Sequence, residues 1–346
     1  MRLVCKSRAS ELYRKTNGES RGTLLKVASR AIVRLHGENP SMNWLTKVAA
    51  YKVISVVPGG ISIYNYSRKN ITRSTVPARE RVAHRVNMGM EYLKTLEKIG
   101  AAGRLKAGAH LDFGCGYNPI IPLLYYSLGC ERQFLFDAIP CLDESLLDAT
   151  IAAFLEVVSD PAWPHAKKIR RLPKREPGRP LAEHMEDMGM TYVAPCAGRF
   201  AEIKAVIDVV TCTGVLYYIS RNELKAIFGS IAACLRKKGL FVATVRLDDE
   251  YRDGDRNISK YNYLRYPPWV WEKLINSRLI SYNRLRAPDY RELLENAGLH
   301  VEQFEIDGPT PADLEELNTI SVHPFFKNYS REELGAKQLA FVATKA

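Results

Sequence analysis

The apolar positions of residues 100–346 change repeatedly between a strand-like and a helix-like spacing. Seven short apolar runs predict β-strands at 109–113, 132–137, 190–195, 205–213, 240–247, 300–307 and 338–345. Apolar residues spaced by three and four positions predict helices between several of these runs, at 119–129, 221–238 and 289–298. Strands that alternate with helices in this way are typical of an α/β fold with a parallel sheet and helical crossovers.

The helix expected after Ser220 carries the clearest local signals in the chain. Ser220 and Glu223 have the spacing of a capping box. The apolar stripe that follows consists of Leu224, Ile227, Phe228, Ile231 and Leu235. The sequence RKKG at 236–239 is expected to end the helix.

Residues 1–78 differ from the rest of the chain and are expected to form a basic, helical arm or lid. Their helical segments are interrupted at HGENPS (36–41) and at VPGG (57–60). A longer helix is predicted from Arg79 to Gly100, because one apolar face recurs at helical spacing along it. The second unit then spans 79–346, with an insertion at about 248–288 that is rich in tyrosine and tryptophan.

The segment LDFGCGYNP (111–119) connects the first predicted strand to its helix. Gly114 and Gly116 can adopt backbone angles that other residues avoid, and they let a ligand approach the main chain closely. Asn118 is expected to cap a helix whose first residue is Pro119. Because proline has no N–H to offer a pyrophosphate, this turn favours a ligand with little phosphate.

Asp137 ends the second predicted strand, 23 residues after Gly114. In parallel α/β sheets, ligands bind beyond the carboxyl ends of the strands, and an acidic residue at this spacing accepts hydrogen bonds from ribose hydroxyls. The turn and the carboxylate together predict a nucleoside-type ligand.

These motifs resemble those of the class I S-adenosylmethionine-dependent methyltransferases. HLDFGCG (110–116) resembles the first motif of that family, FLFDAI (134–139) the second and VIDVVTCTGVLYYIS (206–220) the fourth. The resemblance covers about 79–346. It implies a Rossmann-like, doubly wound sheet of seven strands whose last strand is antiparallel, with S-adenosyl-L-methionine as cofactor and S-adenosyl-L-homocysteine as product.

The resemblance also implies which residues hold the cofactor. Asp112 orients the methionine end, the backbone at Gly114 and Gly116 lies beside it, and Asp137 binds the ribose. The other residues expected at the cofactor are Ala138, Cys196, Ala197 and Thr213. Many relatives have an aspartate for the adenine amine where this chain has Cys196 and Ala197, so backbone contact is expected there instead.

Methyl transfer from a sulfonium is an in-line displacement, in which the enzyme mainly aligns the reactants and excludes water. A base is needed when the acceptor is an alcohol. Many relatives have a Glu-His pair after the fourth strand, whereas this chain has Tyr217 and Tyr218. With Asp248, the first of three acidic residues (Asp248, Asp249 and Glu250) that follow the fifth strand, these tyrosines are the candidates for catalysis.

Tyr64, Asn283 and Arg284 are expected to contact the acceptor. The segment NSRLISYNRLRAPDY (276–290) resembles a segment of the methyltransferases that modify sugars and polysaccharides. We expect the insertion to form either a wall of the acceptor site or a packed lid. Tyr64 and its neighbours either fold over the cofactor or fill a seam between the arm and the sheet.

The predicted function is transfer of a methyl group to an oxygen, or a nitrogen, of a small molecule or saccharide. The first 100 residues hold 19 Lys and Arg against 6 Asp and Glu, which accounts for the positive excess of the whole chain, 50 against 38. Such an arm attracts anionic partners, so RNA methylation and peripheral contact with an anionic membrane stay open. Nucleic acid is not favoured, because no RNA-binding module is recognisable. A non-catalytic cofactor-binding or scaffold protein is the other alternative.

The cysteines and the apolar runs bear on location and metals. Seven cysteines lack zinc spacing and C-x-x-C pairs, which predicts reduced thiols, no metal site and a cytoplasmic protein. The apolar run from Trp44 contains Lys47 and Lys52 and stops at Pro58, so it is too short and too charged to span a bilayer. The sequence gives no indication of the oligomeric state.

Overall fold

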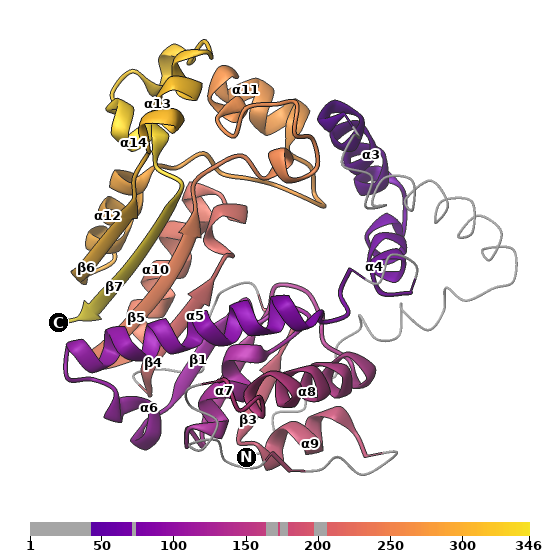
Figure 1. Cartoon of the computed structure of the whole chain (residues 1–346), viewed down its shortest axis with the longest axis vertical. Coiled ribbons are helices and arrows are strands. Elements are labelled where there is room, and N and C mark those ends of the chain that lie inside the picture. Colours follow the sequence, from indigo (N-terminus) through magenta and orange to yellow (C-terminus); the bar gives the residue numbers. More distant parts are fainter. Residues whose placement is uncertain (1–42, 71–73, 164–171, 174–178, 197–205) are drawn as a thin grey trace, which may run out of the picture.

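The computed structural model describes residues 43–70, 74–163, 172–173, 179–196 and 206–346. Within them, one seven-stranded sheet has the order β3-β2-β1-β4-β5-β7-β6 (Figure 1). The strands are β1 (His110–Phe113), β2 (Gln133–Phe136), β3 (Met190–Val193), β4 (Ile207–Thr213), β5 (Leu235–Arg246), β6 (Leu299–Asp307) and β7 (Gln338–Lys345). β7 is antiparallel to both of its neighbours, and the other paired strands are parallel. The predicted Rossmann-like sheet with an antiparallel last strand is confirmed.

Helices cover both faces of the sheet, so the fold is doubly wound. One face packs against α5, α7 and α8, and the other against α10 and α12 (Figure 1). The helices of this unit are α5 (Arg79–Lys98), α6 (Gly103–Ala107), α7 (Ile120–Ser127), α8 (Glu144–Val158), α9 (Leu181–Asp187), α10 (Arg221–Cys234) and α12 (Ala287–Asn296). Each long helix contributes one apolar stripe to the core, as the helical spacing predicts.

The centre of the sheet brings the sequence motifs to one edge. β1 lies between β2 and β4, and Asp112 pairs with Leu135 on one side and Thr211 on the other. Because the three strands are parallel, their carboxyl ends meet at the same edge. The turn after β1 therefore lies next to Asp137, after β2, and next to Thr213, at the end of β4.

Two local predictions about helix ends are wrong. α7 begins at Ile120 with Pro119 in the capping position, and the side chain of Asn118 instead donates to Thr150 Oγ1 on α8, at 2.9 Å. α10 has the predicted capping box but ends at Cys234, and the RKKG sequence belongs to β5. In both places a tertiary partner outcompetes the local signal, since Leu235 pairs with Ile207 of β4.

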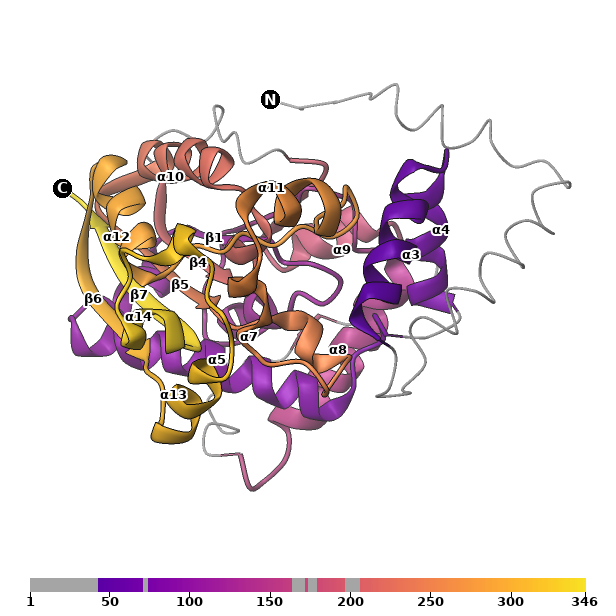
Figure 2. The ribbon, with the colours of Figure 1, turned by 90° about the horizontal axis from the view of Figure 1, so that it is seen from above.

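The described part of the arm forms α3 (Trp44–Val56) and α4 (Gly60–Asn70), separated at the predicted VPGG break. The two helices lie together at one end of the molecule (Figures 1 and 2). α3 packs on the insertion, because the Trp44 ring lies 5.6 Å from Tyr251 and 5.7 Å from Tyr266, and Trp44 N donates to Asp255 Oδ2 at 2.9 Å. None of the helices described here is both long enough and apolar enough to cross a membrane.

The insertion and the C-terminal helices form a cap above the sheet. Their elements are η3 (Glu250–Asp253), η4 (Asn262–Arg265), α11 (Pro268–Val270), η5 (Trp271–Ile275), α13 (Pro311–Asn318), η6 (Pro324–Phe326) and α14 (Arg331–Gly335). One apolar cluster joins this cap to α3, with Trp44, Trp271, Leu317 and Phe326 among its buried side chains. The arm and the insertion therefore share a core that is separate from the two faces of the sheet.

Candidate functional site

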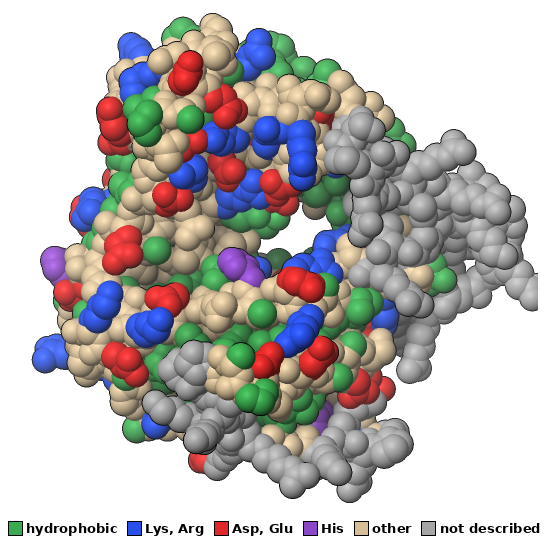
Figure 3. Space-filling view, viewed as in Figure 1, with side chains coloured by type: hydrophobic (Ala, Val, Ile, Leu, Met, Phe, Trp, Pro, Cys, Tyr) green, Lys and Arg blue, Asp and Glu red, His purple; other side chains and the backbone are tan. Residues whose placement is uncertain are grey.

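A cavity of about 630 Å³ opens at the carboxyl ends of β1 and β4. Its size is that of a small-molecule site. Its walls come from α4, α5, the turn after β1 and the residues after β4, and they include Arg68, Arg81, His84, Arg85, Asp112, Gly114, Gly116, Thr213 and Tyr218. Figure 3 shows this face of the molecule hollowed between the insertion and α5, with Lys and Arg side chains along the rim on the insertion side.

The two glycines of the turn have different tasks. Both have positive φ, +81° at Gly114 and +66° at Gly116. A Cβ at Gly114 would lie 2.5 Å from Val215 Cγ2, whereas a Cβ at Gly116 would meet nothing within 4 Å. Gly114 is therefore required by packing against the β4 side, and Gly116 keeps open space above the backbone where a ligand can lie.

Asp137 lies against this turn. Its Oδ2 accepts a hydrogen bond from Gly116 N at 2.6 Å, and its side chain is almost buried. Burial raises its pKa, while hydrogen bonds from backbone N–H groups, first that of Gly116, oppose the shift. Asp137 does not line the 630 Å³ cavity itself. Cys196 N donates to the Asp137 backbone oxygen at 2.6 Å, Ala138 follows on the surface, and Ala197 lies outside the described residues.

Asp112 and Arg85 place opposite charges in the cavity wall. Asp112 is 5% exposed and accepts from Thr211 Oγ1 at 2.8 Å. Burial raises its pKa to about 6, against the effects of the Thr211 hydrogen bond and the Arg85 charge. Arg85 reaches in from α5, and its Nη1 donates to the Thr213 backbone oxygen at 3.2 Å. Among the described residues, no ion pair joins these two side chains.

Arg85 was missed by the sequence analysis. It lies between Val82 and Val86, two fully buried residues of the α5 stripe. A charged residue inside an apolar stripe was the signal that could have found it, because such a residue usually has a partner or a ligand.

The two tyrosines after β4 meet a carboxylate from the insertion. Tyr217 and Tyr218 lie in the short helix η2 (Leu216–Tyr218). Tyr217 OH donates to Glu250 Oε2 at 2.6 Å, Tyr218 OH to the same oxygen at 2.8 Å, and the two hydroxyls are 2.7 Å apart. Burial, and then the negative charge of Glu250, raise the pKa of both phenols. Both tyrosines therefore remain protonated at neutral pH.

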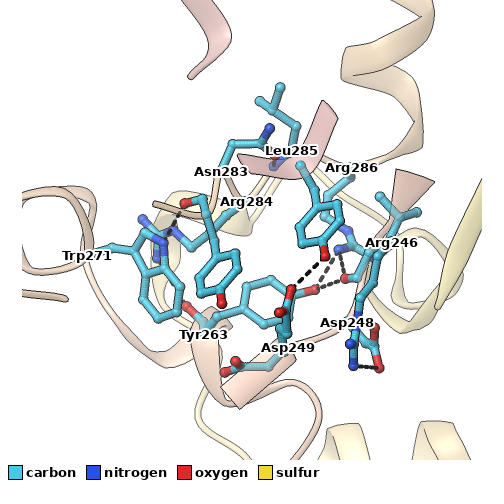
Figure 4. Close-up of a pocket in the computed structure, with 13 residues that line it drawn as sticks. Arg246, Asp248, Asp249, Tyr263, Trp271, Asn283, Arg284, Leu285 and Arg286 are labelled. Carbon is cyan, nitrogen blue, oxygen red and sulfur yellow. Dashed lines mark hydrogen bonds and ion pairs between the residues drawn. The ribbon is translucent and has the colours of Figure 1, made fainter. Parts of the chain in front are cut away.

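Asp248 is held elsewhere. Its two carboxylate oxygens accept from Arg246, Oδ1 from Nε at 2.5 Å and Oδ2 from Nη2 at 3.1 Å (Figure 4). It lines a small pocket under the insertion together with Tyr217 and Glu250. The structure thus brings Tyr217 and Tyr218 to Glu250, and it brings Asp248 to Arg246.

The residues expected at the acceptor fall in two places. Asn283 and Arg284 line a second cavity, of about 860 Å³, between α3, η5 and η6. Asn283 Nδ2 donates to the backbone oxygens of Leu216 and Ile219, at 2.9 and 2.7 Å, which ties this cavity to the tyrosine wall. Tyr64 is buried in α4 and lines neither cavity, while Asn65 Oδ1 accepts from Tyr117 OH, at 3.1 Å, next to the glycine turn. In the described part of the chain, no group of three or more His, Cys, Asp or Glu side chains is placed to hold a metal.

Residues 83–303 match a protein-family model described as a methyltransferase domain. Among solved structures, the chain is similar to an S-adenosylmethionine-dependent methyltransferase from Mesorhizobium loti, with 15% identity, coverage of 69% of this chain and 93% of that one, and a TM-score of 0.38. A methyltransferase from Methanosarcina mazei is 11% identical, with coverage of 68% and 92% and a TM-score of 0.36. A geranyl diphosphate methyltransferase in complex with SAM is 13% identical, with coverage of 78% and 90% and a TM-score of 0.40. No curated protein matches the sequence.

Proposed function

This chain belongs to the class I S-adenosylmethionine-dependent methyltransferases, and we propose that it methylates an oxygen, or a nitrogen, of a small molecule or saccharide. The family match covers well over half of the chain, from within α5 to within β6. S-adenosyl-L-methionine supplies the methyl group as a sulfonium, and S-adenosyl-L-homocysteine is the product.

The residues around the 630 Å³ cavity fit this cofactor. Asp112 and Arg85 offer one negative and one positive charge to the amino and carboxylate groups of its methionine end. Gly116 leaves free space above the turn, and Thr213 lies across from it at the end of β4. Asp137, which hydrogen-bonds to the same turn without lining the cavity, is proposed to accept the ribose hydroxyls, with Ala138 and Cys196 beside it for the adenine.

The hydrogen-bonded group of Tyr217, Tyr218 and Glu250 is the observation that favours an oxygen acceptor. A hydroxyl must lose its proton as the C–O bond forms and the C–S bond breaks, so it needs a path for that proton. Tyr218 lines the proposed cofactor cavity and is 37% exposed, which supports a role for its hydroxyl at the acceptor.

The proton moves through a neutral phenol in this proposal. Tyr218 takes the acceptor's proton at its phenolic oxygen and passes its own proton to Glu250, at 2.8 Å. The raised pKa of Tyr218 fits this role, because the phenol never has to persist as a phenolate. Tyr217, stacked on Tyr282 with ring centroids 6.1 Å apart and an angle of 5° between the planes, holds Glu250 from the other side.

Incubation with S-adenosylmethionine carrying a deuterated methyl group tests the proposal. The acceptors are a panel of neutral and acidic sugars, polar small molecules and RNA, and mass spectrometry detects the product. We expect a methyl ether on a sugar or another small molecule. We also expect that Glu250→Gln lowers kcat while leaving the affinity for S-adenosylhomocysteine unchanged. Label found only in RNA would overturn the proposal.

We further propose a cytoplasmic location for the enzyme. The six cysteines within the described ranges are all free thiols, as expected of a reducing compartment.

A further inference from the structure

Arg284 occupies an unusual position in the wall of the 860 Å³ cavity. Its guanidinium lies over three aromatic rings, 5.3 Å from the centroid of Trp271, 5.7 Å from Phe325 and 5.1 Å from Phe326. Figure 4 shows it against Trp271, on the segment that also carries Asn283. Its Nη1 donates to the backbone oxygens of Tyr263, at 3.1 Å, and Tyr266. The rings and carbonyls fix the side chain without neutralising it.

The neighbouring arginines have more ion-pair or hydrogen-bond partners among the described residues than Arg284 has. Arg246 pairs with Asp248 and Asp253, and Arg221 pairs with Asp289 and Glu292. Arg286 is almost fully buried, and its Nε, Nη1 and Nη2 atoms donate hydrogen bonds to oxygen atoms of the protein.

For Arg284, no carboxylate among the described residues lies within ion-pair distance, and Nε and Nη2 have no protein acceptor there. Both nitrogens keep some solvent-accessible surface. Burial lowers the pKa of Arg284 to about 10, with Glu272 opposing the shift, so the group is a cation at neutral pH. A desolvated cation without an anion is costly, and it becomes favourable when a ligand brings the anion.

The rest of this cavity is polar and aromatic. Hydroxyl and amide side chains that line it are Ser55, Ser220, Asn276, Ser277 and Ser281. Lys52, Arg221 and Arg278 add three cations, of which Arg221 is paired with Asp289 and Glu292, against one acidic residue of the lining, Glu272. Aromatic faces beside hydroxyl and amide groups suit a sugar ring, and a planar guanidinium suits a carboxylate or phosphate.

A wall of aromatic rings separates this cavity from the proposed reaction centre. Tyr282 lines the 860 Å³ cavity, and its ring centroid lies 5.4 Å from that of Tyr218, which lines the cofactor cavity. A saccharide anchored at Arg284 therefore has to extend past the Tyr282 ring to bring its hydroxyl to Tyr218.

We propose that the methyl acceptor is an anionic saccharide and that Arg284 binds its carboxylate or phosphate group through Nε and Nη2. This inference rests on the proposed saccharide acceptor and narrows its class. Arg284 gives the site its preference for charge, and the serines, Asn276 and the aromatic rings hold the sugar.

Equilibrium binding to the full-length protein saturated with S-adenosylhomocysteine tests the inference. The probes are D-glucuronate for a carboxylate, D-glucose 6-phosphate for a phosphate and D-glucose as the neutral reference, measured by calorimetry. We expect at least one charged probe to bind about tenfold tighter than glucose or better, as charge-assisted hydrogen bonds do. The charged probe with the larger gain in affinity over glucose shows whether the site prefers a carboxylate or a phosphate. Equal affinity for all three probes would overturn the inference.

Variants assign the effect to a residue. Arg284→Met should bring the charged probes to the affinity of glucose, and Arg284→Lys, which keeps the charge but loses the fork, should retain part of the preference. Lys327→Gln, at an exposed position next to η6 that does not line the cavity, should change the affinities less than twofold. If Arg284→Met does not fold, Arg284→Lys alone decides, and an unchanged preference in that variant refutes bidentate binding. Binding of glucuronate without any sugar methylation would contradict the proposed function and leave the anion site standing.

Discussion

We expect two single side chains, Arg85 and Asp112, to determine how the proposed cofactor cavity distinguishes an amino-acid group from a plain nucleoside. Arg85 is placed to meet a carboxylate, so we expect Arg85→Gln to weaken S-adenosylhomocysteine by about tenfold or more. Binding of 5′-methylthioadenosine, which lacks the amino-acid end, should be unchanged. Calorimetry with both ligands measures the difference. Arg81→Gln is the matched control, since Arg81 lines the same cavity but donates to the backbone oxygens of Ser74 and Val76. An equal loss for both ligands would show that Arg85 is only structural.

Asp112 gives the cofactor affinity a dependence on pH. Its pKa is raised to about 6, so it is mostly protonated below pH 6 and ionised above it. Only the ionised form attracts the ammonium group of the cofactor. S-adenosylhomocysteine should therefore bind more weakly as the pH falls from 7 to 5, with a slope that approaches tenfold per pH unit. Asp112→Asn should bind weakly at every pH and lose the slope. A wild-type affinity that stays constant over this range would disprove the role of Asp112.

At the scale of single elements, local signals predicted the helices and strands well and their ends less well. The capping box of Ser220 and Glu223 forms as expected, because both partners lie within one helical turn. The predicted start of α7 was wrong because the side-chain amide of Asn118 donates a hydrogen bond to Thr150 of another helix. Such a contact depends on how α7 and α8 pack, and no spacing within the turn encodes it.

The first turn of the insertion contains a buried carboxylate whose effect on the free energy of unfolding can be measured. Asp249 is 3% exposed, its Oδ2 has no hydrogen-bond partner among the described residues, and burial raises its pKa to about 7. A raised folded-state pKa means that the folded protein prefers the protonated form, so the free energy of unfolding falls as the pH rises from about 4 through 7. Asp249→Asn should therefore raise the melting temperature at pH 8, because the free energy of unfolding rises there by on the order of 4 kcal/mol at most, and should change it little at pH 4. A variant that is destabilised at pH 8 would refute this account.

At the scale of the whole molecule, the gathering of the proposed cofactor residues was predictable, and the surroundings of the proposed acceptor residues were not. Asp112, Gly114, Gly116 and Asp137 lie at or just after two adjacent strand ends, and the order of a parallel sheet brings them together. The meeting of Tyr217 and Glu250, which are 33 residues apart, depends on how the insertion folds back. Arg284 has no ion pair among the described residues because of the same packing, and no periodic pattern in the sequence encodes that packing.

The joint core of the arm and the insertion leads to a prediction for the whole cap. Trp44 is 5% exposed and packs on Tyr251 and Tyr266, whereas its neighbour Leu45 is 55% exposed. Trp44→Ala should lower the free energy of unfolding of the cap by about 3–5 kcal/mol, and Leu45→Ala should change it by less than about 0.5 kcal/mol.

Hydrogen exchange with mass spectrometry locates the effect. In Trp44→Ala, amides of the insertion at 250–282 should exchange faster, while those of β1 and α7 keep their protection, because the sheet has cores of its own. Faster exchange across the sheet as well would show that the cap and the sheet unfold as one unit. An unchanged insertion would mean that α3 covers it without stabilising it, and the anion site at Arg284 would then stand independently of the arm.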